Sequence, residues 1–400
     1  MLSDMELKKD FYWAGVLDPS LRVFDIIMQT EFGTTYNSYV LKGSEKTAVF
    51  ETAKGKYADA YLKELSKVVA PDRIDYVIVD HTEPDHTGSL EVLLRQNPNL
   101  QVVGTAVAIQ YLKNIVNREF RSVAVKDGDT LSLGNKTLRF LVLPNLHWPD
   151  SMYTYVEEDG TLITCDSFGA HYSHPGILRS TVTDTEGYLR AAKYYFDNIL
   201  GPFKQPFMAR ALDRIKPLHI DMICPGHGPV LDGKYVAEIQ AIYETWVKPE
   251  APRAQKQVVI PYVSAYGYTG MLAEAIAEGI RKSGDVQVTL YDMVESDENT
   301  VAEAIASADG FLLGSPTILG DALPPIRKLL TSLFPPLCKG KPAGAFGSYG
   351  WSGEAVPNLT EQMKLLKLNV CEGFRVKFKP SDEELAAAEN FGSAFAALLK

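Results

Sequence analysis

A short segment rich in acidic residues and histidine follows an apolar run early in the chain. In VIVDHTEPDHTGSL, residues 77–90, the stretch from His81 to His86 holds two histidines and two carboxylates. The whole chain has only seven histidines, so this local density is unusual. Carboxylates packed this closely repel one another unless solvent or a cation neutralises them. We therefore predict that this segment binds metal.

Three further candidate ligands each stand where an apolar run gives way to a loop. His147 lies in LPNLHWPDS, Asp166 ends the run TLITCD, and His227 lies in the CPGHGP turn. Loops at the ends of buried strands commonly carry functional residues. The combined set of four imidazoles and three carboxylates is too large for one tetrahedral ion and suits two ions that share a carboxylate. The predicted metal ligands are His81, Glu83, Asp85, His86, His147, Asp166 and His227.

The predicted metal site has one carboxylate outside its first loop, Asp166, which is therefore the natural shared ligand. His86 directly follows Asp85, so both side chains must turn toward one ion if both bind it, and the sequence leaves this open. Oxygen and imidazole donors without a thiolate suit iron, manganese or zinc. Two further residues have alternative interpretations. His171 is either a proton donor or hydrogen-bond partner at the site or an ordinary loop residue, and Tyr195 is either a pocket neighbour or part of helix packing.

A second set of residues, SAYGYT at 264–269, leads from an apolar run into a predicted helix. Backbone N–H groups, hydroxyls and the helix dipole in such a loop can bind a monophosphate, or the loop can simply cap the helix. It lacks the lysine of a triphosphate-binding loop. Two loops that follow later apolar runs, at 315–320 and 348–353, mix small and aromatic residues, which suits a flat ring. The predicted cofactor-binding residues are Ser264, Ala265, Tyr266, Gly267, Tyr268, Thr269, Ser315, Pro316, Thr317, Ile318, Leu319, Gly320, Ser348, Tyr349, Gly350, Trp351, Ser352 and Gly353.

The elements that must position these residues change character along the chain. The N-terminal part is rich in strands, and the segment IDYVIVD is continuously apolar, as expected for a strand covered on both faces. The run VKPEAPRAQKQ at 247–257 has prolines, charges and no periodicity, which predicts a linker. We therefore predict domains at 1–250 and 251–400. In the first domain the predicted strands are 23–28, 36–41, 47–51, 74–80, 102–104, 137–143 and 161–166, and the predicted helices are 56–69, 106–116 and 185–200.

The second domain alternates strands and helices regularly, which predicts an open, doubly wound parallel sheet. Ligands of such sheets bind where the carboxyl ends of the strands meet the switch point, and the three loops of the second set emerge there. A phosphorylated receiver domain is the alternative, but it needs acidic residues at the end of the first strand, and VVIPYVS has none. The predicted strands are 258–263, 286–292, 310–315, 342–348 and 374–378. The predicted helices are 270–283, 299–307, 324–333, 354–367 and one that starts at Ser381.

Composition narrows the class of protein. The 400 residues carry a net charge of −10 without basic clusters, which argues against nucleic-acid or anionic-membrane partners. No apolar run is long enough for a membrane span or a secretory signal, so a cytoplasmic location is expected. The four cysteines form no C-x-x-C pair, which excludes a rubredoxin-type iron site within this chain and predicts reduced, mostly buried thiols.

Both sets of residues resemble known families. The pattern H-x-E-x-D-H, followed by a lone histidine, an aspartate and a late G-H-G, resembles the metallo-β-lactamase superfamily, and its αββα sandwich is the implied fold. Glu83 stands where the zinc hydrolases of that superfamily carry histidine, and a harder, anionic ligand favours iron. The 264–269 loop resembles the flavodoxin phosphate loop [ST]-x-T-G-x-T, with Tyr266 in place of the middle threonine. The two halves together resemble the flavodiiron proteins over nearly the whole chain.

This resemblance implies an enzyme that holds FMN and two iron ions per chain and protects anaerobes. It would reduce nitric oxide to nitrous oxide, dioxygen to water, or both. Asp85, His86 and His227 would bind one iron and His81, Glu83 and His147 the other, with Asp166 shared. A head-to-tail homodimer, or a dimer of such dimers, would place one subunit's FMN near the partner's irons, and a separate rubredoxin or similar small protein would supply electrons.

Two other functions are compatible with parts of the sequence. A zinc hydrolase acting through metal-bound hydroxide would explain the histidine-rich set, but it leaves Glu83 and the C-terminal domain without a role. An electron carrier with a vestigial metal loop would explain the C-terminal domain, but it does not explain a complete set of seven ligands. Zinc content distinguishes the first alternative, and a yellow protein without stoichiometric metal distinguishes the second.

Overall fold

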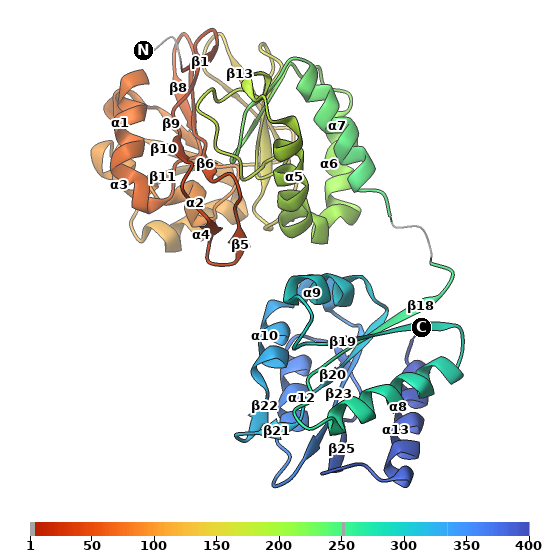
Figure 1. The fold of residues 1–400 in the computed structure, drawn as a ribbon. Coiled ribbons are helices and arrows are strands. Elements are labelled where there is room, and N and C mark those ends of the chain that lie inside the picture. Colours follow the sequence, from red (N-terminus) through yellow and green to blue (C-terminus); the bar gives the residue numbers. More distant parts are fainter. Residues whose placement is uncertain (1–4, 250–252, 334, 400) are drawn as a thin grey trace. The chain divides into compact units, whose positions relative to one another are not determined.

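The computed structural model describes residues 5–249, 253–333 and 335–399 (Figure 1). The chain forms two compact units, which divide after Pro249. The predicted domain boundary at residues 250 and 251 lies outside the described residues. Each unit is described by itself below.

The N-terminal unit is built on two β-sheets with helices on their outer faces (Figure 1). The seven-stranded sheet has the order β1 (Glu6–Lys8), β2 (Phe11–Trp13), β7 (Tyr39–Lys42), β8 (Thr47–Phe50), β9 (Tyr76–Ile78), β10 (Gln101–Thr105) and β11 (Arg121–Val125). The six-stranded sheet has the order β12 (Thr130–Ser132), β13 (Thr137–Val142), β14 (Met152–Val156), β15 (Thr161–Cys165), β16 (Met222–Pro225) and β17 (Leu231–Asp232).

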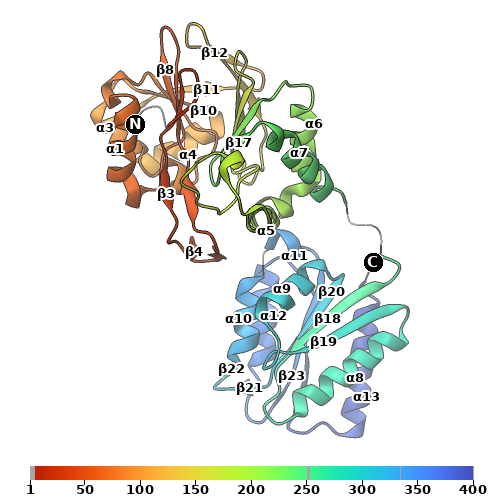
Figure 2. The same ribbon diagram turned by 45° about the horizontal axis from the view of Figure 1, so that its top comes forward.

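Helices cover the outer face of each sheet in this unit (Figures 1 and 2). Helices α1 (Ala58–Val68), α3 (Leu90–Gln96) and α4 (Ala106–Val116) flank the seven-stranded sheet. Helices α5 (Thr185–Tyr195), α6 (Ala209–Ile215) and α7 (Lys234–Trp246) flank the other, and the π-helix Phe196–Leu200 continues α5. This is the predicted αββα sandwich, and its helices at 56–69, 106–116 and 185–200 are confirmed within a few residues.

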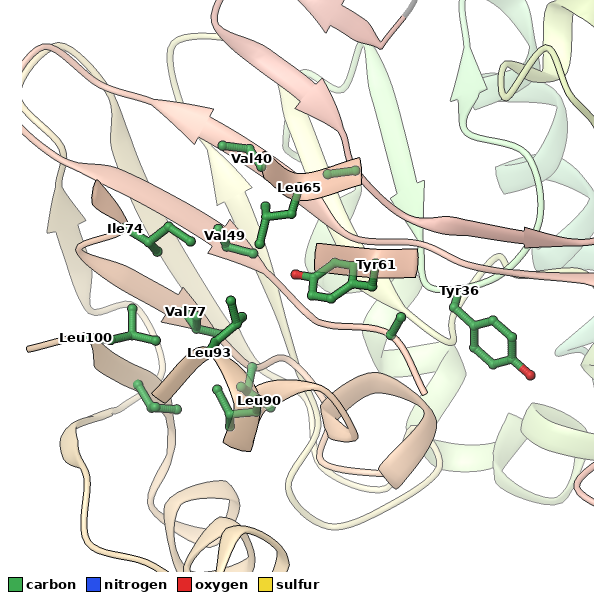
Figure 3. Close-up of a cluster of buried hydrophobic side chains, with 14 of the residues drawn as sticks. Tyr36, Val40, Val49, Tyr61, Leu65, Ile74, Val77, Leu90, Leu93 and Leu100 are labelled. Carbon is green, nitrogen blue, oxygen red and sulfur yellow. The ribbon is translucent and has the colours of Figure 1, made fainter. Parts of the chain in front are cut away.

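Alternation along the strands separates the layers of this sandwich. Val49 and Val77 belong to the cluster beneath the helices, whereas their neighbours Phe50 and Ile78 belong to the cluster between the sheets. Successive side chains of a strand point to opposite faces, so a continuously apolar strand can fill both layers at once. Figure 3 shows the helix-side cluster, in which Val77 lies among side chains from neighbouring strands and from α1 and α3.

Two strand predictions in this unit are wrong in the same way. The predicted strand 23–28 is a hairpin of β4 (Val23–Phe24) and β5 (Met28–Gln29), because Asp25 and Ile26 have positive φ and turn the chain back. The predicted strand 36–41 is divided between β6 (Thr34–Tyr36), which pairs with β3 (Val16–Asp18), and β7 in the large sheet. An apolar pattern indicates which residues are buried, but it does not indicate where the chain turns or where a strand changes its pairing partner.

The C-terminal unit is an open sheet with the order β19 (Val286–Asp292), β18 (Lys256–Tyr262), β20 (Gly310–Gly314) and β23 (Pro342–Tyr349), followed by β24 (Asn369–Val370). Strand β25 (Phe374–Lys377) also pairs with β23. Every ladder in this sheet is parallel. Helices connect β18, β19, β20 and β23 in turn, and the chain passes from β19 across β18 to β20, which gives the doubly wound fold that the sequence predicts.

Helices lie on both faces of this sheet (Figure 2). Helices α8 (Tyr268–Lys282) and α13 (Asp382–Ala396) lie on one face, with Ser381 as the N-cap of α13. Helices α9 (Glu298–Ser307), α10 (Pro324–Ser332) and α12 (Ala355–Leu365) lie on the other. The short α11 (Pro335–Cys338) precedes β23. In the described parts of both units, no helix is long and apolar enough to cross a membrane.

Two leucines on helices of the C-terminal unit test how its core contributes to stability. Leu329 on α10 is fully buried, whereas Leu365 at the end of α12 is 81% exposed. We expect Leu329→Ala to lower the free energy of unfolding by about 2–5 kcal/mol, because it removes buried methyl groups and leaves a cavity. The matched variant Leu365→Ala should change it by less than about 0.5 kcal/mol. Urea unfolding of the full chain measures both, and equal losses would contradict this assignment of the core.

Candidate functional site

Strand directions bring the predicted metal ligands to one edge of the N-terminal unit. Strands β13, β15 and β16 run the same way, because β14 is antiparallel to both β13 and β15, and β15 is parallel to β16. Their carboxyl ends therefore share an edge, and His147, Asp166 and His227 follow those ends. The other four ligands follow β9 of the opposite sheet, with Asp85 and His86 on the short helix α2 (Pro84–Thr87).

The first ligand group consists of His81, Glu83, His147 and Asp166, whose ligand atoms all lie within 4.8 Å of one another. The Nε2 atoms of His81 and His147 lie 3.2 and 3.0 Å from Glu83 Oε2. Nε2 of His147 also lies 3.2 Å from Asp166 Oδ2. Two imidazoles and two carboxylates thus point at a common centre, with Glu83 and His147 half-buried and the other two buried.

The second ligand group consists of Asp85, His86 and His227, all buried and within the same 4.8 Å limit. Nε2 of His227 lies 3.0 Å from Asp85 Oδ2, and Nε2 of His86 lies 3.5 Å from the same oxygen. The other oxygen of Asp166 joins this group, because its Oδ1 lies 3.1 Å from His86 Nε2. The two oxygens of Asp166 therefore face different groups.

The charges within the site depend strongly on one another. Burial by itself would raise the pKa of Asp166, but His86 and His147 hold that pKa well below its ordinary value. Burial would likewise raise the pKa of Asp85, and His86 and His227 lower it. Burial would lower the pKa of His147, but hydrogen bonds to Asp166 and Glu83 raise it to about 9. The carboxylates stay ionised and need positive charge beside them, which protons on imidazole or metal ions can supply.

The far ring nitrogens of His81 and His227 each face a hydrogen-bond acceptor. Asp150, fully buried, lies 3.3 Å from His81 Nδ1 and accepts hydrogen bonds from the backbone N–H and the hydroxyl of Thr82. The backbone carbonyl of Thr35 lies 2.6 Å from His227 Nδ1. Such partners fix the tautomer and the orientation of a metal-binding imidazole.

Sequence analysis missed Asp150 and a second buried carboxylate, Glu51. Glu51 follows β8, which runs parallel to β9, and its Oε1 accepts hydrogen bonds from the N–H groups of Asp80 and His81. The signal for Glu51 was present, because it ends the apolar run TAVFE as Asp166 ends TLITCD. Asp150 lies within LHWPD but not at a strand end, so spacing alone gave no reason to select it.

The two predicted neighbours of the metal site both lie beside it. The Tyr195 hydroxyl donates a hydrogen bond of 2.9 Å to Asp166 Oδ1. The buried His171 ring packs at a tilt against Phe24, with ring centroids 4.3 Å apart, and its Nδ1 lies 2.9 Å from the Thr34 hydroxyl. Burial and the nearby His227 lower the pKa of His171 well below its ordinary value, so this ring is neutral at pH 7. Neither residue belongs to a ligand group.

The predicted cofactor loops meet at the carboxyl edge of the parallel sheet in the C-terminal unit, after β18, β20 and β23. The Ser264 hydroxyl accepts a hydrogen bond of 3.1 Å from the Gly270 N–H, and the hydroxyls of Thr269 and Ser348 lie 3.0 Å apart. The first contact closes the first loop on the start of α8, and the second ties that loop to the third. Gly267, with φ of 81°, forms the left-handed turn before α8, a conformation that favours glycine.

The same edge exposes large apolar side chains from all three loops. Tyr266 is 77% exposed, Leu319 is 99% exposed and Trp351 is 95% exposed. Exposed apolar residues gathered at one place commonly mark a binding site. The Ser315 hydroxyl accepts a hydrogen bond from the N–H of Leu323 and donates one to the Pro316 carbonyl.

Both sites fit the groups that the sequence predicts. Two clusters of hard oxygen and imidazole donors, joined by a carboxylate, suit two ferrous ions. Oδ1 of the buried Asp85 has no hydrogen-bond partner among the described residues, and a bound metal ion would give this oxygen a partner. Hydroxyls at the start of α8, with exposed aromatic rings beside them, suit a phosphate joined to a flat ring.

Comparisons with known proteins agree with this geometry. Residues 34–228 match the family described as ODP family beta lactamase, and residues 260–392 match the flavodoxin family. The flavo-diiron protein FprA2 of Clostridium acetobutylicum is 42% identical over 98% of both chains. A nitric oxide reductase of Moorella thermoacetica is 32% identical over 99% of both chains.

A solved structure supports the same assignment. The rubredoxin oxygen:oxidoreductase from Desulfovibrio gigas superposes with a TM-score of 0.71 at 28% identity, and the match covers 98% of each chain. Flavodiiron proteins carry a di-iron site, and their flavodoxin domain binds FMN, in agreement with both predicted cofactors. The similarity covers both units and nearly every residue, and this chain belongs to the flavodiiron proteins, a family of oxidoreductases.

Proposed function

We propose that this flavodiiron protein reduces nitric oxide to nitrous oxide, dioxygen to water, or both, at a di-iron site supplied with electrons by FMN. The observation that carries the proposal is the arrangement of Asp166, whose two oxygens face two separate groups of imidazoles and carboxylates. Nitric oxide and dioxygen as substrates are supported by the names of two relatives, the Moorella nitric oxide reductase and the Desulfovibrio rubredoxin oxygen:oxidoreductase.

Each of the two ligand groups would hold one iron. His81, Glu83 and His147 would hold one iron, and Asp85, His86 and His227 would hold the other. Asp166 would bind both, with one oxygen toward each group. When bound, two ferrous ions and reduced FMN can together supply four electrons, the number that reduces dioxygen to water.

Residues around the irons prepare the site for this reaction. The Tyr195 hydroxyl holds Asp166 Oδ1, so the shared carboxylate keeps one orientation. Asp150 and the Thr35 carbonyl fix the rings of His81 and His227. The buried His171 ring packs against Phe24, and its centroid lies 5.4 Å from that of the His227 ring, so a further imidazole stands beside the proposed iron site. Rigid support of this kind keeps ligands in productive geometry.

In the flavodoxin unit, the loop at 264–269 would hold the FMN phosphate with its hydroxyls and the amide groups at the start of α8. Trp351 and Tyr266 would contact the isoalloxazine ring, since their side chains are exposed at the same edge of the sheet. Tyr349 is half-buried below this edge, where its ring lies 5.9 Å from the Arg375 guanidinium carbon.

The alternative of a zinc hydrolase is less well supported. Glu83 reaches both His81 and His147, so the first group carries two carboxylates, which favours a harder ion than zinc. Hydrolysis also gives the flavodoxin unit no role, whereas family membership extends over both units.

We further propose a cytoplasmic enzyme that receives electrons from a separate rubredoxin or similar small protein. The Desulfovibrio relative is named for such a donor, and this chain has no C-x-x-C pair of its own. A head-to-tail homodimer, or a dimer of such dimers, would bring the FMN of one subunit near the irons of its partner. Electron transfer weakens steeply with distance, so this arrangement would raise the rate of transfer.

Rapid mixing with each gas tests the proposed reaction. We expect purified protein loaded with iron and FMN, then reduced anaerobically, to be reoxidised within seconds by nitric oxide, dioxygen or both, with nitrous oxide or water as product. Asp166→Asn should lose at least tenfold in rate, since it weakens both iron sites. Stopped-flow absorbance of FMN and gas analysis measure the reaction. A protein that contains only zinc, or that neither gas reoxidises, would contradict the proposal.

Trp351 provides a test of the FMN site. We expect Trp351→Ala to raise the dissociation constant for FMN roughly tenfold, because stacking on an aromatic ring is lost. Trp351→Phe keeps a ring and should bind nearly as tightly as the wild type. Fluorescence titration of the FMN-free protein measures both, and the exposed Leu365→Ala serves as a control away from the loops. Unchanged affinity in Trp351→Ala would show that this side chain does not contact the flavin.

Dilution tests the proposed dimer. If the flavin of one subunit serves the irons of its partner, turnover per chain should fall once the concentration drops below the dimer dissociation constant. Turnover and mass can be followed together over a dilution series. A monomer that keeps full turnover would rule out transfer between subunits.

A further inference from the structure

Three of the candidate ligand histidines, His81, His86 and His227, have a hydrogen-bonding group facing Nδ1, and these groups differ in strength as acceptors. Nδ1 of His81 faces the Asp150 carboxylate, and Nδ1 of His227 faces the Thr35 carbonyl. Nδ1 of His86 faces a thiol instead, with Cys165 Sγ at 3.5 Å. If Nε2 of His86 binds the metal ion, the proton of the neutral ring lies on Nδ1 and would be donated to this sulfur. Sulfur is a weak acceptor compared with a carboxylate or carbonyl oxygen.

The position of the His86 ring is also restricted by sterics. A Cβ atom added to Gly226 would lie 2.6 Å from His86 Cε1 and 3.1 Å from its Nδ1. Gly226 in turn donates a backbone hydrogen bond of 2.6 Å to the Cys165 carbonyl. The edge of the His86 ring therefore lies between the Cys165 thiol at the end of β15 and the Gly226 backbone just after β16.

A third residue completes the surroundings of this ring. Glu51 is fully buried, and ligand atoms of Glu51, His86 and Cys165 lie within 4.8 Å of one another. Oε1 of Glu51 is occupied by backbone N–H groups, whereas its Oε2 has no hydrogen-bond partner among the described residues. The Nδ1 side of His86 thus meets polar atoms, but Cys165 is the one within hydrogen-bond distance.

We propose that the Cys165 thiol positions His86 for the second ligand group, and that this weak support makes the ion of that group the more easily removed of the two. Acceptors on the far nitrogen orient a ligating imidazole and raise its basicity, so a weaker acceptor gives a weaker ligand. The ion of the first group, with His81 held by a buried carboxylate, is retained longer. The inference rests on the di-iron centre proposed above.

Graded chelation of the iron-loaded protein tests this assignment. We expect the wild type to lose its two irons in two steps as chelator concentration rises. Cys165→Ala should move the earlier step to about 10- to 100-fold lower chelator concentration and leave the later step in place. Asp150→Asn, which weakens the support of His81, should move the later step instead. Iron per chain and the spectrum of the remaining iron are the readouts, so no turnover is needed.

Controls separate positioning from general damage to the core. Cys224 is a fully buried cysteine on the neighbouring strand β16, and Cys224→Ala should leave both steps unchanged. In a His86→Ala background, Cys165→Ala should add no further loss, because the thiol would act only through that ring. Gly226→Ala crowds the same ring edge and should lower the affinity at the earlier step in the wild type, but not in His86→Ala.

The outcomes distinguish this inference from the proposed function. A wild type that cannot hold two irons would contradict the di-iron centre itself. A wild type that holds two irons, with a Cys165→Ala variant whose steps match those of Cys224→Ala, would overturn the role of Cys165 alone. Equal shifts of both steps, or the same shift in the His86→Ala background, would also overturn it and show a structural role.

Discussion

The Asp166 carboxylate, buried between two groups of imidazoles, is the interaction on which the rest of the structure depends. An isolated carboxylate in this position would be very unfavourable, because burial removes its solvation. Histidines on both sides hold its pKa well below the ordinary value, and the Tyr195 hydroxyl donates to one of its oxygens. The site is therefore stable only if positive charge is present on both sides of one carboxylate. Two metal ions, one in each ligand group, would meet that requirement.

This requirement explains why two sheets are needed. Strands β13, β15 and β16 of one sheet end at the same edge and position His147, Asp166 and His227, but only one of these three candidate ligands is a carboxylate. The opposite sheet supplies the other two carboxylates, Glu83 and Asp85, on the segment that follows β9. Apolar residues packed between the sheets, such as Phe50 and Ile78, fix the position of one set of strand ends relative to the other. A close-packed interior deforms little, so ligands from distant parts of the sequence reach fixed positions without long flexible loops.

The sequence pattern could select candidate ligands at strand ends, but it could not select residues whose role depends on the side chain that they face. All seven proposed ligands could be selected because a polar residue at the end of an apolar run is conspicuous, and the structure brings them together. Asp150 and Cys165 could not, because their importance comes from which imidazole each one faces. The hairpin at 23–28 was misread for a related reason, since the apolar residues beside Asp25 are alike in a strand and in a turn. The alternation of strands and helices was sufficient to predict the main sheet of the flavodoxin unit, where each strand pairs in parallel with its neighbours.

The two sites also differ in how they meet their ligands. Most of the metal ligands are buried and held by hydrogen bonds before any ion is bound, so little ordering is required when metal enters. The loops proposed to bind the flavin instead leave Trp351 and Leu319 almost fully exposed, and a bound ring that covered them would remove their apolar area from water. Metal affinity should therefore depend on the hydrogen bonds behind the ligands, whereas flavin affinity should depend on the area that the ring covers. Within the metal site the same reasoning separates the two ions, because a carboxylate supports His81 and a thiol supports His86.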